Sequence, residues 1–228
     1  MSAVLESKHL ELTKSEVIYG VSWEIYESLL EKYSEMPSPR LSYDSGMLEV
    51  EITNSLKHEE SNRTIARLAE TILLELEIDF VNCGSTTYRR REIRKGFEPD
   101  SGFYIESLSL IEGKSDLDYE KDPPPDLTIE VNRTNSSVPR MPIFAAFGAK
   151  EVWRFDGKTI KFYALEDGIY LETETSIALP ILTSAKADEF LRDSRELKST
   201  AWAKMIRDWV KEIIKKKKLR GQKSDCKS

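Results

Sequence analysis

The pentapeptide LTIEV, which begins at Leu127, restricts the fold of this chain more than any other segment. In an extended chain, alternate side chains point to opposite faces, so the three aliphatic residues share one face and Thr128 shares the other with Glu130. A short run of this kind is typical of a central strand in a sheet covered on both faces. A carboxylate at Glu130 must then be paired, protonated or bound to a cation.

A long helix between residues 55 and 78 is the second strong signal. Its apolar residues fall on one face at helical spacing, so we expect it to pack on the sheet; they are Ile65, Leu68, Ala69, Ile72 and Leu76. Helices are also predicted at 22–33 with Ser22 as N-cap, at 142–148 ended by Gly148, at 187–194 and at 201–217. Strands are predicted at 41–52 as a hairpin about Asp44–Gly46, at 80–93, 99–111, 127–131, 151–156, 159–165 and 168–174.

This order of elements predicts the α/β class. We expect a mixed β-sheet flanked by helices, with an N-terminal helix and hairpin and a C-terminal helix. At 228 residues the chain suits one domain with an extension. The expected division is a main domain at 1–198 and a C-terminal amphipathic helix with a basic tail at 199–228.

The charge and the apolar content limit the partners. The chain carries a net charge of −6, although residues 211–223 contain seven basic residues and one acidic one. An acidic body disfavours tight nonspecific DNA binding, whereas the lysine run is either a solvated helix end or a contact for an anion. No run of 18 apolar residues and no signal-peptide pattern is present, and Cys83 and Cys226 read as free thiols. We therefore expect a cytoplasmic protein with no membrane partner.

The motifs that are missing direct attention to carboxylates. The only histidines are His9 and His58, and the phosphate-binding glycine motifs and the GxSxG elbow are absent. Asp100, after Pro99 at the start of a predicted strand, could join Glu130 to bind a hard cation such as Mg²⁺. Such an ion polarises a phosphoryl oxygen and lowers the pKa of bound water. The structural alternative is a turn residue at Asp100 and an ion pair at Glu130.

Several segments, in this order, resemble one large bacterial family of restriction-endonuclease-like proteins: SYDSGMLEV, KHEE, GSTTYRRR, GFEPDSGFYI, DPPPDLTIEV and EVWRFDG. The resemblance covers roughly residues 10–210. The family is assigned to the PD-(D/E)XK nuclease superfamily, in which two acidic residues on adjacent strands bind a metal ion. The resemblance implies a Mg²⁺- or Mn²⁺-dependent endonuclease that acts on nucleic acid, with DNA expected before RNA.

Each position of the family motif has a counterpart in this chain. Asp100 corresponds to the first acidic residue and Glu130 to the second, and both are the expected metal ligands. The lysine of the motif is replaced by Asn132, so Arg140, or failing it Lys150, would have to supply the cation. The remaining candidates are Glu49 and Glu59, to complete the metal shell, and Arg89, Arg90 and Arg91, to bind nucleic acid. Because the lysine is missing, a non-catalytic protein that binds nucleic acid or protein stays open as the alternative.

The predicted C-terminal helix has its own apolar face. Trp202, Ile206, Trp209 and Ile213 recur at helical spacing. This face either packs on the chain's own domain or forms a homodimer contact, since aromatic residues are enriched in the cores of interfaces.

Overall fold

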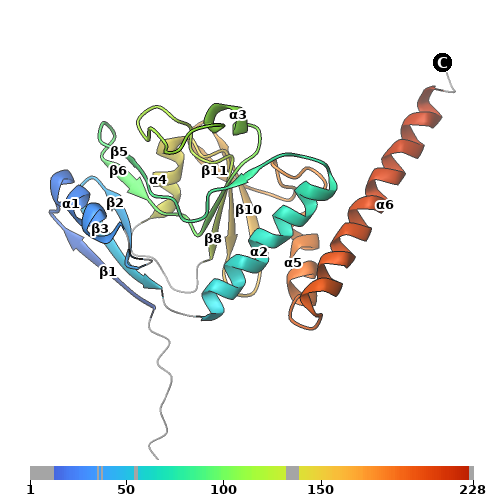
Figure 1. Ribbon diagram of the computed structural model, residues 1–228, viewed down its shortest axis with the longest axis horizontal. Coiled ribbons are helices and arrows are strands. Elements are labelled where there is room, and N and C mark those ends of the chain that lie inside the picture. Colours follow the sequence, from blue (N-terminus) through green and yellow to red (C-terminus); the bar gives the residue numbers. More distant parts are fainter. Residues whose placement is uncertain (1–12, 35, 37, 54–55, 132–138, 226–228) are drawn as a thin grey trace, which may run out of the picture.

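The computed structural model describes residues 13–34, 36, 38–53, 56–131 and 139–225, which form two β-sheets and the helices around them (Figure 1). The five-stranded sheet has the order β1-β3-β2-β6-β5, and the six-stranded sheet has the order β11-β10-β9-β8-β7-β4. The strands are β1 Thr13–Tyr19, β2 Arg40–Asp44, β3 Met47–Thr53, β4 Val81–Asn82, β5 Tyr88–Arg90, β6 Lys95–Phe97, β7 Ser101–Tyr104, β8 Leu127–Val131, β9 Glu151–Phe155, β10 Ile160–Glu166 and β11 Ile169–Thr173. The helices are α1 Trp23–Tyr33, α2 Leu56–Glu75, α3 Leu108–Ile111, α4 Arg140–Phe147, α5 Ser184–Asp193 and α6 Ser199–Asp225.

Strand β8 lies inside the six-stranded sheet, as the LTIEV pattern predicts. It pairs antiparallel with β7 on one side and parallel with β9 on the other, so the sheet is mixed. All five of its residues are buried. The α/β class and the mixed sheet flanked by helices are therefore confirmed.

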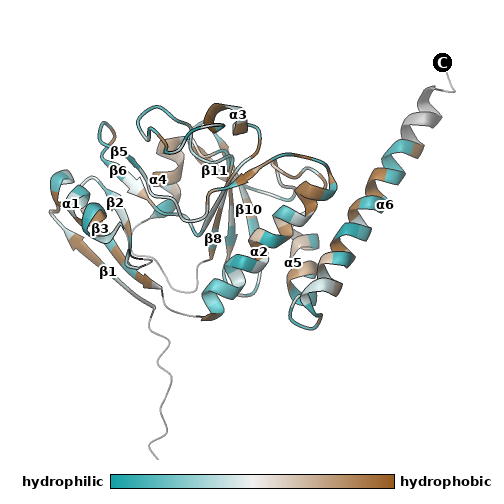
Figure 2. Ribbon diagram, viewed as in Figure 1, coloured by the Kyte–Doolittle hydropathy of each residue, from teal (hydrophilic) through white to brown (hydrophobic). Residues whose placement is uncertain are grey.

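The main core lies on the aliphatic face of β8. Leu127, Ile129 and Val131 belong to one buried cluster with the apolar faces of α2, α5 and α6. The face of α2 consists of the residues predicted from the spacing, with Ile65, Leu68, Ala69 and Ile72 fully enclosed or nearly so. Figure 2 shows hydrophobic and hydrophilic residues alternating along α2 and α6, as expected for helices buried on one side.

Three local predictions about helix ends and a turn are confirmed. The Ser22 hydroxyl accepts a hydrogen bond from the backbone N–H of Ile25 and caps α1. The β2–β3 turn has positive φ angles at Ser45 and Gly46, as tight hairpin turns require. Gly148 ends α4 in the left-handed conformation, with φ of 81°.

Three predictions about strands are corrected. The strand expected at 80–93 is divided between β4 in the six-stranded sheet and β5 in the five-stranded sheet. The strand expected at 99–111 ends at Tyr104, and residues 108–111 form α3 instead. The Asp126 carboxylate accepts hydrogen bonds from the backbone N–H groups of Ile105 and Ser107, which takes this segment out of the sheet. Strand β1 was not predicted at all; it pairs with β3 along its whole length. Within the described residues, no helix is long and apolar enough to cross a membrane.

Helix α6 packs on its own chain through a face slightly different from the predicted one. Trp202, Ile206 and Val210 are buried in the main core, whereas Trp209 is only partly buried and contacts the Phe190 ring edge-on. The indole N–H of Trp202 also donates a hydrogen bond of 2.7 Å to the Phe190 carbonyl. Beyond this contact, the C-terminal end of α6 extends away from the sheets (Figure 1).

Replacing Trp202 with alanine is expected to lower the free energy of unfolding by about 3–5 kcal/mol, because a large core side chain and its hydrogen bond are lost together. Urea denaturation followed by circular dichroism measures this change. The matched control is Leu219→Ala on the exposed end of the same helix, for which a change within about 0.5 kcal/mol is expected. Equal stability of the Trp202→Ala and wild-type proteins would contradict the packing.

Candidate active site

The two acidic residues of the predicted pair face each other across adjacent strands. Antiparallel pairing joins Ser101 to Ile129 and Gly102 to Thr128. Continuing this register by one residue places Asp100 opposite Glu130. Residues opposite each other in an antiparallel pair project to the same face of the sheet. Both side chains are buried, with 4% of Asp100 and 2% of Glu130 exposed, so the sheet brings two carboxyl groups into one enclosed region.

Both carboxylate oxygens of Asp100 have a bonding partner. Arg40, the first residue of β2, forms an ion pair with Oδ1, and the backbone N–H of Val131 donates a hydrogen bond of 2.7 Å to Oδ2. The Nε2 atom of His58 lies 3.5 Å from Oδ1. The side-chain amide of Asn62 on α2 donates to the Asp100 carbonyl. Groups from β2, α2 and β8 therefore fix this carboxylate.

Glu130 is paired on one oxygen only. Arg140, at the start of α4, donates a hydrogen bond of 2.9 Å from Nη1 to Oε2. The other oxygen, Oε1, is buried and has no hydrogen-bond partner among the described residues. Burial raises the pKa of Glu130, and the nearby Glu51 carboxylate adds to this rise, while Arg140 and Arg40 oppose it. The Oε1 atom is thus suited to hold a proton or to contact a cation.

The β2–β3 hairpin closes the site from the other sheet. Arg40 lies opposite Glu51 in the hairpin register, so its polar face carries charges of both signs. Arg140 forms an ion pair with Glu51 and lies 3.6 Å from Glu49 through its Nε and Oε2 atoms. Sequence reasoning identified Glu49 but missed Arg40. The polar–apolar alternation of both hairpin strands was the available signal for a charged face.

His58 and Glu59, in the first turn of α2, lie beside the Asp100 end of the carboxylate pair. The Nε2 atom of His58 is 3.0 Å from the Val131 carbonyl. Because a carbonyl oxygen only accepts, Nε2 carries the proton. Burial and the Arg40 charge lower the pKa of His58 and favour its neutral form. Glu59 contacts Arg40 at 3.6 Å and is 44% exposed, so it approaches Asp100 through the arginine rather than directly.

The charges of the cluster do not balance. Among the described residues, Asp100 and Glu59 contact Arg40, while Glu49, Glu51 and Glu130 contact Arg140, so five carboxylates share two guanidinium groups. An enclosed excess of carboxylate oxygens is the environment that hard divalent cations prefer. In the described part of the chain, no three His, Cys, Asp or Glu side chains are yet arranged as a metal-binding group. The oxygen chemistry and the unpaired Oε1 of Glu130 nevertheless fit Mg²⁺ or Mn²⁺.

The structure separates the two residues considered as substitutes for the missing lysine. Arg140 contacts Glu130 directly, as described above. Lys150 instead contacts Glu106 at 2.8 Å and Asp126 at 3.1 Å, at the opposite end of β8 from Glu130. Asn132, which replaces the lysine, lies outside the described residues. Of the two candidate substitutes, Arg140 is therefore the one that contacts the carboxylate pair.

The three consecutive arginines have different surroundings. Arg90 donates hydrogen bonds to the carbonyls of Tyr119 and Asp122, which makes it a structural bridge. Arg91 pairs with carboxylates of α1, and its side chain is exposed. The Arg89 guanidinium lies over the Tyr119 ring, 5.2 Å from its centroid. Binding of nucleic acid by Arg89, Arg90 and Arg91 stays a prediction.

Comparison with known proteins shows a family to which most of the chain is similar, and a solved structure that is similar to part of it. The model of the family Uma2, described as "Putative restriction endonuclease", matches residues 23–196. A solved structure from Anabaena variabilis, described as a "putative nuclease belonging to DUF820", is 14% identical and has a TM-score of 0.48. The alignment covers 71% of this chain and 98% of that chain. No curated protein matches the sequence.

Proposed function

Because the chain belongs to the Uma2 family, whose model matches residues 23–196, we propose that it is a metal-dependent endonuclease that hydrolyses phosphodiester bonds of nucleic acid. One observation carries this proposal: the β7–β8 register sets Asp100 opposite Glu130 in a buried region with more carboxylates than cations. Burying these groups is costly, so a function that requires them explains why they are there.

Asp100 and Glu130 are the residues that would hold Mg²⁺ or Mn²⁺. When bound, a divalent cation activates water and offsets the charge that develops on the phosphoryl group. The backbone N–H of Val131 orients the Asp100 carboxylate, and Arg140 orients Glu130 through Oε2 while Oε1 stays unpaired. Arg40 offsets the Asp100 charge in the structure described here. Glu49 supports the site through Arg140, and Glu59 supports it through Arg40.

Arg140 is the residue expected to replace the lysine of the motif. Its guanidinium keeps its positive charge at all physiological pH values, and it can donate hydrogen bonds to a phosphate oxygen. Burial lowers the pKa of Arg140, but the charges of Glu130 and Glu51 outweigh this effect and raise the pKa above its usual range. An arginine is a poor proton acceptor, so its role in this proposal is to stabilise negative charge rather than to deprotonate water.

Cleavage is expected to require added Mg²⁺ or Mn²⁺ and to stop when a chelator is added. Glu130→Gln should abolish it, since the amide keeps the size of the side chain but loses the negative charge. The control is Glu172→Gln, which changes an exposed carboxylate paired with Lys161. Single- and double-stranded DNA and RNA should be assayed at low salt, because salt weakens binding to phosphates. Cleavage that survives in Glu130→Gln would exclude this site as its source.

A non-catalytic protein that binds nucleic acid or protein is the second candidate. The observation in its favour is that Arg40 and Arg140 already neutralise part of the charge on Asp100 and Glu130. Such a protein would bind an oligonucleotide or a protein with equal affinity in the presence of Mn²⁺ and in the presence of chelator. It would leave the oligonucleotide intact under both conditions.

A further inference from the structure

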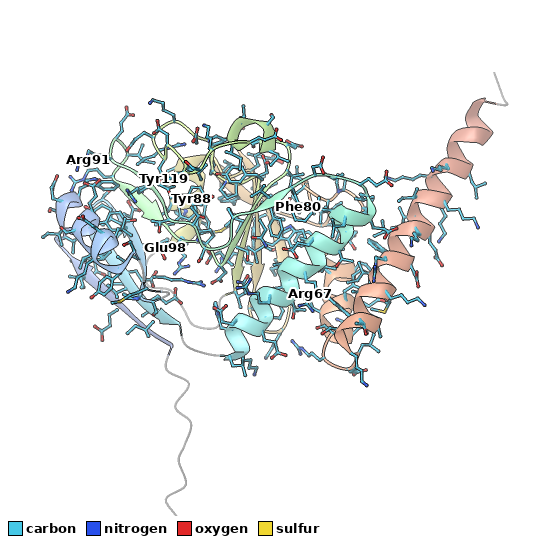
Figure 3. The ribbon with its side chains drawn as sticks, viewed as in Figure 1. Arg67, Phe80, Tyr88, Arg91, Glu98 and Tyr119 are labelled. Atoms are coloured by element: carbon cyan, nitrogen blue, oxygen red, sulfur yellow. The ribbon has the colours of Figure 1, made fainter. Side chains whose placement is uncertain are left out.

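A cleft of about 650 Å³ lies beside the candidate active site. The C-terminal half of α1, the start of β2 and residues 85–87 form its walls, and Arg40, Arg89, Glu98 and Tyr119 are among the lining residues. Arg40 also forms the ion pair with Asp100, so one side chain belongs to both the cleft and the carboxylate pair. Figure 3 shows Glu98 and Tyr119 on this side of the molecule, next to the five-stranded sheet.

Arg89 is the arginine of the 89–91 run that is left for a ligand. Arg90 is used in hydrogen bonds to two backbone carbonyls, and Arg91 is paired with Glu24 and Glu27. Across the described ranges, Arg89 makes no ion pair, and its guanidinium lies over the Tyr119 ring. An arginine on an aromatic ring offers a flat cationic surface on which a nucleobase can stack.

Besides a surface for stacking, a base needs hydrogen-bonding partners along its edge. Polar groups in the same cleft can supply them. The Thr87 hydroxyl donates a hydrogen bond of 3.1 Å to Glu98 Oε1. The Glu98 carboxylate is also hydrogen-bonded to the backbone of Leu41, and burial raises its pKa. Ser85 lines the same cleft. A carboxylate accepts hydrogen bonds from the amino and imino groups of bases, whereas it repels a bare phosphate.

We propose that this cleft binds one unpaired nucleotide of the nucleic-acid substrate, with its base on the Arg89–Tyr119 surface and a phosphate toward the Asp100–Glu130 pair. The inference rests on the proposed nuclease function, because it places the bound nucleotide next to the bond that is cut. The volume of the cleft lies within the range of about 300–1,000 Å³ typical of small-molecule sites. The acidic residues of the cleft, Glu27, Glu31 and Glu98, favour a ligand with a neutral base over a polyanion such as free pyrophosphate.

Nucleoside monophosphates test the cleft without cleavage. Isothermal titration calorimetry with each of the four deoxynucleoside and four ribonucleoside 5′-monophosphates should show binding of at least one to the wild-type protein with Mn²⁺ present, and weaker binding in chelator. Arg89→Ala should weaken it by roughly 5- to 150-fold, the range for loss of one base-stacking group. Arg67→Ala is the matched control, since Arg67 is exposed on α2 away from the cleft (Figure 3). No binding of any nucleotide, or equal binding by Arg89→Ala, would overturn the proposal.

Folding and function are separated by two further measurements. Thr87→Val should weaken nucleotide binding while the melting temperature stays within a few degrees of the wild type. In a cleavage assay on a single-stranded oligonucleotide, Arg89→Ala should raise KM more than it lowers kcat, because the residue holds the base rather than the reacting phosphate. Nucleotide binding by a protein that cleaves nothing would refute the nuclease function and keep the cleft. Cleavage with an unchanged KM in Arg89→Ala would refute the cleft and keep the nuclease.

Discussion

Asp100→Ala is expected to destabilise the protein by about 3–5 kcal/mol in addition to abolishing cleavage, because it removes one partner of a buried ion pair. Among the described residues, the ion pair that then remains to the Arg40 guanidinium, whose side chain is 9% exposed, is the 3.6 Å contact with Glu59. It also removes the acceptor for the Val131 N–H. Urea unfolding of the purified variants measures the change in the free energy of unfolding.

Asp100→Asn separates the structural role of this residue from its chemical role. An asparagine oxygen can still accept the hydrogen bond from Val131, so we expect a smaller loss of stability than with alanine. Because the charge needed to hold a divalent cation is gone, cleavage should be lost equally in both variants. An Asp100→Ala protein as stable as the wild type would show that the ion pair with Arg40 does not form. Cleavage retained by a folded Asp100→Asn protein would remove Asp100 from the proposed site.

Arg140→Ala is expected to have an effect of similar size, about 3–5 kcal/mol, since it leaves Glu49, Glu51 and Glu130 close together without their shared cation. A divalent cation should partly restore the stability of this variant by binding the carboxylates that have lost their cation. At a concentration 100 times its dissociation constant, a ligand specific for the folded state adds about 2.7 kcal/mol. Melting temperatures measured with and without Mg²⁺ or Mn²⁺ should therefore differ more for Arg140→Ala than for the wild type.

The control for Arg140→Ala is Lys161→Ala, which breaks an exposed pair with Glu172. Exposed pairs contribute about 0–1 kcal/mol, and no effect of divalent cations on this variant's relative stability is expected. If cations raise the melting temperatures of Arg140→Ala and Lys161→Ala by the same amount, they act on the whole protein rather than at the carboxylate cluster. That result would contradict a cation site at Glu130.

The part of the site that depends on local pattern could be predicted from the sequence. The alternation within LTIEV places Glu130 opposite to the aliphatic face of β8, and the structure has that face in the main core. The contacts that complete the site join residues far apart in the chain. Arg40 and Asp100 are 60 residues apart, and His58 and Val131 are 73 residues apart. Local periodicity does not specify which hairpin or helix end reaches a given strand.

The C-terminal helix shows the same limit within a single element. At 3.6 residues per turn, Trp202, Ile206 and Val210 form one apolar stripe, while Trp209 and Ile213 form an adjacent one. Both stripes satisfy the helical period, so composition alone favours the aromatic residues. Packing against α2 and α5 selects the stripe that contains Val210. Strand β1 and helix α3 were missed for a related reason, since each is fixed by contacts with distant residues.

The most direct test of the proposed site is a crystal structure of the protein grown with Mn²⁺ and measured at the manganese absorption edge. The account predicts one anomalous peak bonded to carboxylate oxygens of both Asp100 and Glu130, with Arg40 moved away from Asp100 Oδ1. Arg140 should keep its contact with Glu130 Oε2. A structure at millimolar Mn²⁺ with no peak between these carboxylates, and with Arg40 still paired to Asp100, would contradict the account.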